Sequence, residues 1–220
     1  MPDRREPPVE GMDAFFTARV DTYEEHMLAS WKEVYPLFAS LLPDGAREVL
    51  DLGCGTGLEL DALFARRNDL RVVGVDLTPA MLDRLRAKPY AASLELIQGD
   101  YFLVPLGSAR FDAALSFETL HHFPYGKKLG LYQRLFEALR PGGVYLECDY
   151  MCDTREQEDF FQAEAARLRR EAGLPADAYV HYDTPLTVER QKELLTLAGF
   201  SPIEELYNDG GTVILRAWRE

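Results

Sequence analysis

Residues 49–60 read VLDLGCGTGLEL, an apolar run that contains one acid and leads into three alternating glycines. The apolar run predicts a buried β-strand, and the glycines allow the backbone to turn sharply and to approach a ligand closely. Glycine-rich turns after strands commonly bind phosphate. Asp51, just before this turn, would repel an anionic phosphate and attract a positive charge. The stretch therefore favours a ligand that carries a cation.

The spacing of the glycines distinguishes between two candidate cofactors, NAD and S-adenosylmethionine (SAM), which both contain a nucleoside. A dinucleotide-binding loop requires G-x-G-x-x-G, and counted from Gly53 its third glycine would fall on Leu58. The chain has G-x-G-x-G instead, which argues against NAD. SAM has an ammonium, a sulfonium and an adenosine but no phosphate, so Asp51 suits this cofactor. A second acid, Asp76, ends the next apolar run, where a carboxylate could accept hydrogen bonds from ribose hydroxyls.

Strand-like and helix-like segments alternate along the rest of the chain. The strand candidates are 47–52, 71–77, 94–100, 111–117 and 143–150, and helical patterns cover 58–67, 79–88, 127–139, about 153–171 and 188–198. Such alternation predicts a parallel sheet that is covered by helices on both faces. Residues 203–218 read as two strands around the turn sequence NDGG, which is a hairpin signal. We therefore expect an α/β fold with a doubly wound, mostly parallel sheet that finishes with an antiparallel strand.

The length of 220 residues suits one domain with additions. We expect a flexible tail at 1–11, an N-terminal helical lid at 12–44, and the main domain at 45–220 with an insertion at 153–186. Apolar residues recur at helical spacing in the lid, where Asp13 and Asp21 are plausible helix caps. Two helices are therefore expected there.

The composition narrows the possible partners. The chain has 24 basic and 37 acidic side chains, and this net charge of −13 makes nucleic acid an unlikely partner. An odd number of cysteines, three, favours a reducing cytoplasm over a disulfide framework. The apolar stretches are too short to span a bilayer, and the start lacks the apolar region of a secretory signal. We expect a cytoplasmic protein without a membrane partner.

The chain resembles a known family in four successive motifs. VLDLGCGTG, VVGVDLTPAML, LIQGDY and FDAALSFETLHHF resemble, in order and spacing, the class I (Rossmann-like) SAM-dependent methyltransferases of the small-molecule type. The resemblance covers roughly residues 45–150. It implies seven strands with the last antiparallel, SAM as the cofactor and S-adenosylhomocysteine (SAH) as the product. No Asp/Asn-Pro-Pro-Tyr motif follows residues 111–117, which weakens the case for methylation of a base nitrogen.

The resemblance also implies a role for each matched position. The glycine loop would line the methionine part of SAM, and residues 76–77 would bind the ribose hydroxyls and pack on adenine. Residues 100–101 would contact the adenine amino group, and residues 116–117 would lie beneath the sulfonium. The implied cofactor-binding residues are Asp51, Gly53, Cys54, Gly55, Gly57, Asp76, Leu77, Asp100, Tyr101, Ser116 and Phe117.

Two further segments offer candidate contacts. Arg19 and Tyr23 lie one helical turn apart, so they could close over SAM and reach its carboxylate. Members of the family commonly use an N-terminal helix in this way. The alternative is a solvated helix face with a tyrosine packed at its edge. The aromatic stretch at 179–182 is either a wall of the acceptor pocket or packing for a lid helix.

Catalytic candidates follow the fourth predicted strand. Methyl transfer depends on aligning the acceptor, and a general base helps only when the acceptor must lose a proton. Glu118, His121 and His122 lie where such a group would be needed, although paired histidines also serve as loop anchors or helix caps. Adjacent residues of an extended segment point to opposite sides, so we do not expect the two histidines to hold a metal.

These observations favour one function over two others. The leading hypothesis is a SAM-dependent methyltransferase that moves the methyl group to an oxygen or nitrogen of a small-molecule acceptor by direct in-line displacement. One alternative is a SAM-binding protein without turnover, such as a sensor or an inactive subunit. The other is a tRNA- or protein-directed methyltransferase, which the negative charge disfavours.

Overall fold

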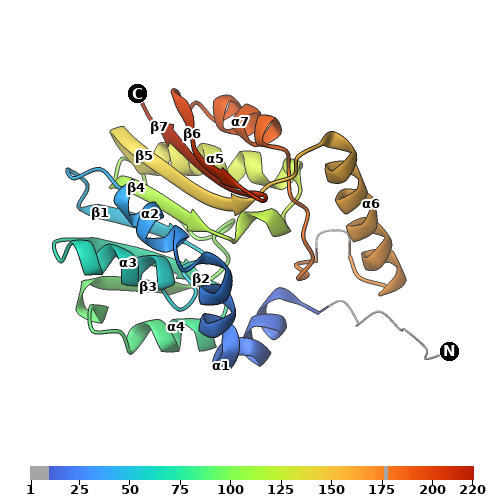
Figure 1. The fold of residues 1–220 in the computed structure, drawn as a ribbon, viewed down its shortest axis with the longest axis horizontal. Coiled ribbons are helices and arrows are strands. Elements are labelled where there is room, and N and C mark those ends of the chain that lie inside the picture. The colour runs from blue at the N-terminus through green and yellow to red at the C-terminus, as the bar shows by residue number, and fades with distance from the viewer. Residues whose placement is uncertain (1–9, 176–177) are drawn as a thin grey trace.

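The fold is organised around one seven-stranded sheet (Figure 1). The computed structural model describes residues 10–175 and 178–220. The strands are β1 Glu48–Leu52, β2 Arg71–Asp76, β3 Leu94–Gln98, β4 Phe111–Phe117, β5 Leu139–Tyr150, β6 Ile203–Asp209 and β7 Thr212–Trp218. Their order is β3-β2-β1-β4-β5-β7-β6, and β1 to β5 are parallel, whereas β7 is antiparallel to β5 and β6. The predicted α/β fold and the terminal hairpin are confirmed.

The strand order reverses between β1 and β4. From β1 the chain proceeds outward to β2 and β3, and then returns to the other side of β1 with β4 and β5. Because the connections leave β1 and β4 in opposite directions, a crevice forms at their carboxyl ends, where open α/β sheets bind ligands. The glycine loop after β1 and the two histidines after β4 therefore meet at this edge.

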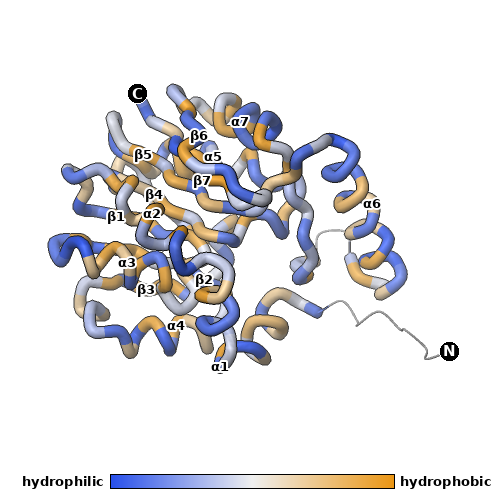
Figure 2. The backbone as a smooth tube through the Cα atoms, viewed as in Figure 1, coloured by the Kyte–Doolittle hydropathy of each residue, from blue (hydrophilic) through white to orange (hydrophobic). Residues whose placement is uncertain are grey.

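Helices cover both faces of the sheet. One hydrophobic cluster packs α2 Val34–Ser40, α3 Leu58–Arg66 and α4 Pro79–Arg86 against one face. The other cluster packs α5 Tyr125–Ala138 and α7 Val188–Leu197 against the opposite face. Neighbouring residues of β1 divide between the two clusters, as the alternation of side chains along a strand requires. In Figure 2 orange segments run through the middle of the sheet, around β4 and β5, in keeping with this two-sided burial.

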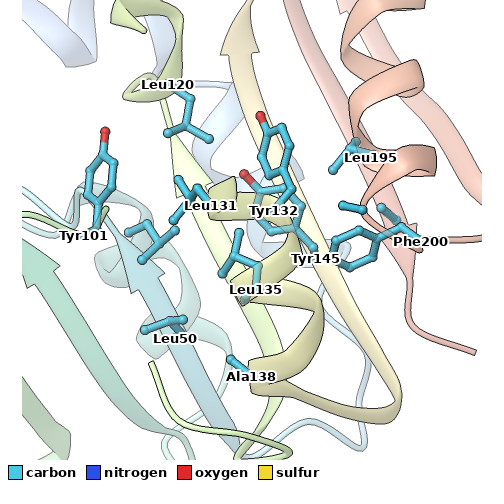
Figure 3. Packing of buried hydrophobic residues seen from close by; sticks show 14 of the residues in the cluster. Leu50, Tyr101, Leu120, Leu131, Tyr132, Leu135, Ala138, Tyr145, Leu195 and Phe200 are labelled. Atoms are coloured by element: carbon cyan, nitrogen blue, oxygen red, sulfur yellow. The ribbon is translucent and has the colours of Figure 1, made fainter. Parts of the chain in front are cut away.

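Aromatic packing fixes α5 on the sheet (Figure 3). Tyr132 of α5 and Tyr145 of β5 are both fully buried, with ring centroids 5.9 Å apart, and Phe200 lies 6.1 Å from Tyr145. Leu135 fills the space one turn further along the helix. Buried aromatic rings contribute large apolar areas to a core. This packing holds α5 against β5, and with it the residues that follow this strand.

The N-terminal segment contains the two expected helices, but the break between them is not at Asp21. The first is continuous over α1 Met12–Trp31, and Gly11 precedes it without a side-chain cap. Asp21 lies within α1 and does not begin a second helix; its side chain forms an ion pair with Arg84 of α4. Asp13 lies inside the first turn, where an acid favours the helix dipole. The break comes later, before α2.

The predicted insertion contains α6 Arg155–Glu171, which together with α1 lies at one end of the sheet (Figure 1). A capping box starts α6, since Thr154 accepts from the Gln157 amide while the Gln157 side chain accepts from the Thr154 amide. Most of the predicted tail, residues 1–9, lies outside the described residues. Within 10–175 and 178–220, no helix has the length and apolar character needed to cross a membrane.

Candidate cofactor and acceptor site

The glycine loop follows β1 and touches the elements on either side. Gly53, Gly55 and Gly57 have φ values of 70°, 48° and 80°, which residues with a side chain rarely adopt. The Gly53 amide donates to the Val75 carbonyl of β2 at 2.8 Å. A Cβ at Gly53 would overlap the hydroxyl of Thr119. The motif is therefore required both by the backbone conformation and by the close approach of the turn after β4.

Asp76 ends β2, and two backbone amides hold its carboxylate. Oδ2 accepts from the Gly55 amide at 2.9 Å, and Oδ1 accepts from the Thr78 amide at 2.7 Å. Burial raises the pKa of Asp76, while the two amides act against this rise. The side chain also lines the smaller of two neighbouring cavities. One carboxylate thus fixes the loop and borders the space beside it.

Asp51 lies fully buried beneath the loop, not in the wall of either cavity. Neither carboxylate oxygen has a donor in hydrogen-bond geometry among the described residues, although the acid Glu59 of α3 lies close enough to interact with it. Burial raises the pKa of Asp51 to about 7, the interaction with Glu59 acts against this rise, and the charge of the nearby Asp76 adds to it. The pKa of Glu59 on α3 is also raised, by burial and then by Asp51.

This buried acid distinguishes between the possible ligands. A buried carboxylate without a partner is costly, and the cost falls when a positive charge comes near. The ammonium of SAM supplies such a charge, whereas a pyrophosphate would add a third anion to Asp51 and Asp76. The residues below the loop therefore fit SAM.

The smaller cavity, of about 60 Å³, lies at the carboxyl ends of β1, β2 and β3. The predicted cofactor residues in its wall are Gly53, Asp76, Leu77, Asp100 and Tyr101. Sites for drug-sized ligands usually measure about 300–1,000 Å³. The cavity as it stands thus has room for only part of a nucleoside, and the side chains that cover it have to move to admit SAM.

Two segments cover the smaller cavity. Met12 and Phe16 come from α1, and Tyr179 comes from the predicted insertion. The Tyr179 hydroxyl donates to Asp100 Oδ2 at 2.6 Å, and the Met12 amide donates to the Tyr179 carbonyl at 3.1 Å. Gly11 forms an isolated antiparallel β-bridge with Val180. The start of α1 and residues 178–184 therefore act as one covering unit.

A larger cavity of about 870 Å³ adjoins the first. Phe16, Glu118 and His122 line both cavities, so the two spaces meet at these three side chains. Arg19 and Tyr23 line the larger cavity on the inner face of α1. All four histidines of the chain, His26, His121, His122 and His181, also line it.

The histidines after β4 do not point to opposite sides, and that expectation is wrong. It assumed an extended backbone, whereas His121 and His122 lie in the 3₁₀ turn Leu120–His122 with ring centroids 4.0 Å apart. Both approach Asp183 Oδ1, His121 with Nε2 at 3.6 Å and His122 with Nδ1 at 3.2 Å. On its other side, His121 Nδ1 hydrogen-bonds Asp149 Oδ1 at 2.6 Å.

The two neighbouring histidines have opposite protonation states at neutral pH. Burial acts against the charge of His121, but Asp149 outweighs this effect and raises the pKa of His121 to about 9. Burial, and then the charge of His121, lower the pKa of His122 to about 4. Burial tends to raise the pKa of Asp183, but the interactions with His122 and His121 are stronger together and lower this pKa to about 2. The cluster thus contains one cationic imidazole, one neutral imidazole and one carboxylate.

Glu118 has a strained backbone at the junction of the cavities. Its φ is +49°, and backbone strain of this kind in a residue other than glycine concentrates at functional sites. Burial raises the pKa of Glu118 to about 8, and Oε1 is buried without a hydrogen-bond partner in the described part of the chain. Glu118 is therefore a neutral acid at pH 7, directly between the two spaces.

Several expected residues support the site without lining a cavity. The hydroxyls of Ser116 and Tyr145 hydrogen-bond at 2.7 Å, and Phe117 stacks on Tyr35 with a centroid distance of 4.4 Å. Both side chains therefore hold β4 in the core. Three loop residues are likewise absent from the two cavity walls: Cys54, Gly55 and Gly57.

Arg19 lines the larger cavity, but its guanidinium already forms an ion pair with Glu10 at 2.7 Å.

The sequence pattern missed Asp183 and Phe16. Asp183 follows the aromatic stretch at 179–182, yet its approach to His121 and His122 arises only when the insertion folds back over the turn after β4. Phe16 matched the apolar periodicity of α1, which marks a buried face but not a cavity wall. Neither contact has a local sequence signal.

Comparisons with known proteins relate the chain to methyltransferases. Residues 49–143 match the family of methyltransferase domains. The chain is 32% identical over 194 residues to carboxy-S-adenosyl-L-methionine synthase of Campylobacter concisus (strain 13826), covering 83% of this chain and 81% of that protein. It is 30% identical over 165 residues to erythromycin 3''-O-methyltransferase of Saccharopolyspora erythraea, covering 71% of this chain and 51% of that protein.

A solved DhpI–SAH complex has the same fold, with a TM-score of 0.71 at 19% sequence identity and coverage of 94% of both chains. The G-x-G-x-G loop, the buried acid beneath it and the strand order β3-β2-β1-β4-β5-β7-β6 point to the same relationship. The chain belongs to the class I SAM-dependent methyltransferase family, and it is an enzyme that uses SAM as its cofactor.

Proposed function

We propose that this protein is a cytoplasmic enzyme that transfers the methyl group of SAM to an oxygen or nitrogen of a small-molecule acceptor. The observation that carries the proposal is the shared wall of the two cavities, formed by Phe16, Glu118 and His122. The smaller cavity is bordered by the residues expected to bind SAM. The larger, at about 870 Å³, is of the size that encloses a small molecule.

In this proposal a specific residue of the chain contacts each part of SAM. Asp76 binds the ribose hydroxyls, Leu77 packs on adenine, and Asp100 accepts a hydrogen bond from the adenine amino group. The glycine loop holds the methionine part of SAM above Asp51, which attracts the ammonium. Tyr23 faces this loop, because a Cβ on Gly55 would lie 3.7 Å from the Tyr23 hydroxyl. Tyr23 is thus better placed than Arg19 to reach the cofactor.

The transfer itself takes place at the shared wall. The acceptor nucleophile approaches the methyl group from the larger cavity, in line with the bond from that carbon to sulfur. Glu118, His121 and His122 surround this path. His122 is neutral at pH 7, and a neutral imidazole has one nitrogen lone pair free to accept a proton from the nucleophile. His121, being protonated, contributes a positive charge and not a base.

Of the N-terminal segment 12–44, the start of α1 is proposed as a lid that opens together with residues 178–184, whereas α2 stays packed in the core. Changing Tyr179 to Phe removes the bond to Asp100 Oδ2 that holds the lid closed. A hydrogen bond to a charged group contributes roughly 1.5–3 kcal/mol. We therefore expect SAM to associate about tenfold faster with this variant in stopped-flow measurements. Tyr207→Phe removes a hydroxyl from the distant strand β6 and should leave the rate unchanged; an equal rate for Tyr179→Phe and the unmodified protein would contradict the lid.

A second candidate is the synthesis of carboxy-SAM. It is favoured by the 32% identity to the Campylobacter concisus synthase over 81% of that protein's length. In this reading the larger cavity holds a carboxyl donor in place of a methyl acceptor. The two reactions leave different nucleoside products, since methyl transfer yields SAH and the synthase reaction yields a heavier derivative of SAM.

The deciding experiment identifies that product by mass spectrometry. The protein is incubated with SAM and panels of small alcohols, phenols, amines and carboxylic acids. SAH together with a methylated panel member supports the proposal, whereas a carboxylated SAM supports the second candidate. Methylation confined to added RNA or protein would overturn the small-molecule assignment. Tight SAH binding without turnover on any panel would favour a binding protein.

A further inference from the structure

One end of the larger cavity gathers ligands of the kind that transition metals bind. His121 and His122 come from the turn after β4, and Asp183 comes from the folded-back insertion. We propose that these three side chains bind a divalent transition-metal ion of the zinc type. The ion occupies the acceptor side of the shared wall, apart from the contacts expected for SAM.

The distances fit tetrahedral coordination. Zinc binds imidazole nitrogens and carboxylate oxygens at about 2.0–2.2 Å, so two tetrahedral ligand atoms lie about 3.3–3.6 Å apart. His122 Nδ1 lies 3.2 Å and His121 Nε2 lies 3.6 Å from Asp183 Oδ1. The ligand atoms of all three residues lie within 4.8 Å of one another. Small side-chain adjustments therefore suffice to place one ion between them.

The hydrogen bonding around the cluster also suits a metal. His122 is 4% exposed, and its Nδ1 has no hydrogen-bond partner among the residues described, despite the nearby carboxylate. His121 uses Nδ1 to bond Asp149 at 2.6 Å, which leaves Nε2 directed towards Asp183; binding of the ion releases the proton that Nε2 carries in the metal-free protein. A carboxylate behind a metal-binding histidine fixes the ring and raises its basicity. Asp149 would act in this way as a positioning residue.

A metal here would define the acceptor more closely. Two histidines and one carboxylate leave at least one coordination position for a substrate atom, as in catalytic zinc sites. All three ligands line the larger cavity, and the Asp183 side chain is 41% exposed, so an ion can enter from that side. The acceptor class is then a small molecule whose hydroxyl, carboxylate or amine coordinates the ion. This refinement of the acceptor rests on the proposed function, whereas binding of the ion does not.

Metal binding and proton acceptance at His122 Nδ1 exclude each other, because both use the same lone pair. The first experiment therefore measures binding alone. Protein treated with a chelator and dialysed is titrated with Co²⁺, a zinc substitute whose visible absorption reports its ligands, and then with Zn²⁺ as a competitor. We expect one Co²⁺ per chain, bound at micromolar concentration or tighter and displaced by Zn²⁺. All three cysteines are buried, which keeps their thiols away from the added ion.

Variants identify the ligands. His122→Ala and Asp183→Asn are expected to lose the Co²⁺ absorption, and Asp149→Asn to weaken binding about 10–100-fold. His26→Ala, which removes an exposed histidine of the same cavity, should bind Co²⁺ like the unmodified protein. SAH titration and circular dichroism of each variant separate misfolding, or failure of the proposed cofactor site, from loss of the metal site.

Two results would overturn the metal site. One is the absence of stoichiometric Co²⁺ binding by the unmodified protein. The other is retention of full Co²⁺ affinity in both His122→Ala and Asp183→Asn. If Glu118→Gln abolishes binding while Asp183→Asn does not, the ion belongs instead to the neighbouring set Glu118, His121 and Asp149, and the assignment made here is wrong.

Discussion

Replacing Asp76 with alanine is expected to lower the affinity for SAM and SAH about a hundredfold. The carboxylate accepts from the amides of Gly55 and Thr78 and borders the cofactor cavity, so the change loosens the loop and removes the proposed ribose contact. Hydrogen bonds to a charged group contribute roughly 1.5–3 kcal/mol each. Since 1.4 kcal/mol corresponds to a factor of ten, the loss of two such bonds, each at the lower end of this range, gives about two orders of magnitude.

Calorimetric titration with SAH measures this effect directly. The matched control is Asp83→Ala, which removes an exposed acid from α4; within the described part of the chain its one ion pair is with Arg86. The control should bind SAH as tightly as the unmodified protein. Equal affinities for the two variants would show that the ribose contact has been assigned to the wrong acid.

The affinity for SAM is expected to rise with pH until about pH 7 and then to level off. Burial raises the folded-state pKa of Asp51 to about 7, so this acid is neutral at lower pH and ionised above it. Only the ionised carboxylate attracts the SAM ammonium. If binding needs the ionised form, affinity rises by up to tenfold for each pH unit below the pKa, because one unit corresponds to 1.36 kcal/mol.

The raised pKa of Asp51 also determines how the stability of the folded protein changes with pH. An acid with a raised folded-state pKa stabilises the free protein fully at low pH, and this contribution is lost as the pH increases through about 7. SAM should therefore protect the fold most strongly near neutral pH, where Asp51 is ionised and the SAM amine still carries its proton. Asp51→Asn should remove the pH dependence of binding between pH 5 and about 7. Adenosine, which lacks the ammonium, serves as the control ligand; a parallel rise for adenosine would assign the effect to another group.

The framework of the fold could be predicted from sequence because its signals are local. Strands such as 111–117 are short apolar runs, and the terminal hairpin is marked by its NDGG turn. Asp51 was identified as unusual by its position before a glycine turn, and its burial without a partner among the described residues gives that position a physical reason. Each of these features depends on residues that are close together in the chain.

The acceptor side of the site could not be predicted in this way. The relative direction of His121 and His122 depends on a 3₁₀ turn that an apolar or polar pattern does not reveal. Asp183 reaches both rings only after the insertion folds back, and Phe16 reaches both cavities only because α1 runs unbroken past Asp21. These contacts arise from tertiary packing, which overrides local preferences for caps and extended segments.

The gathering of the four imidazoles has a consequence for spectroscopy. Because the sequence contains four histidines and each of them borders the larger cavity, ¹⁵N-labelling of histidine alone places every isotope label at the site. Although the protein has a mass of 25.0 kDa, the ¹⁵N spectrum of the imidazole rings then contains signals from this one cavity. Tautomer, protonation and metal coordination each shift imidazole nitrogens differently, so one titration would follow all three at the acceptor site with no background from the rest of the fold.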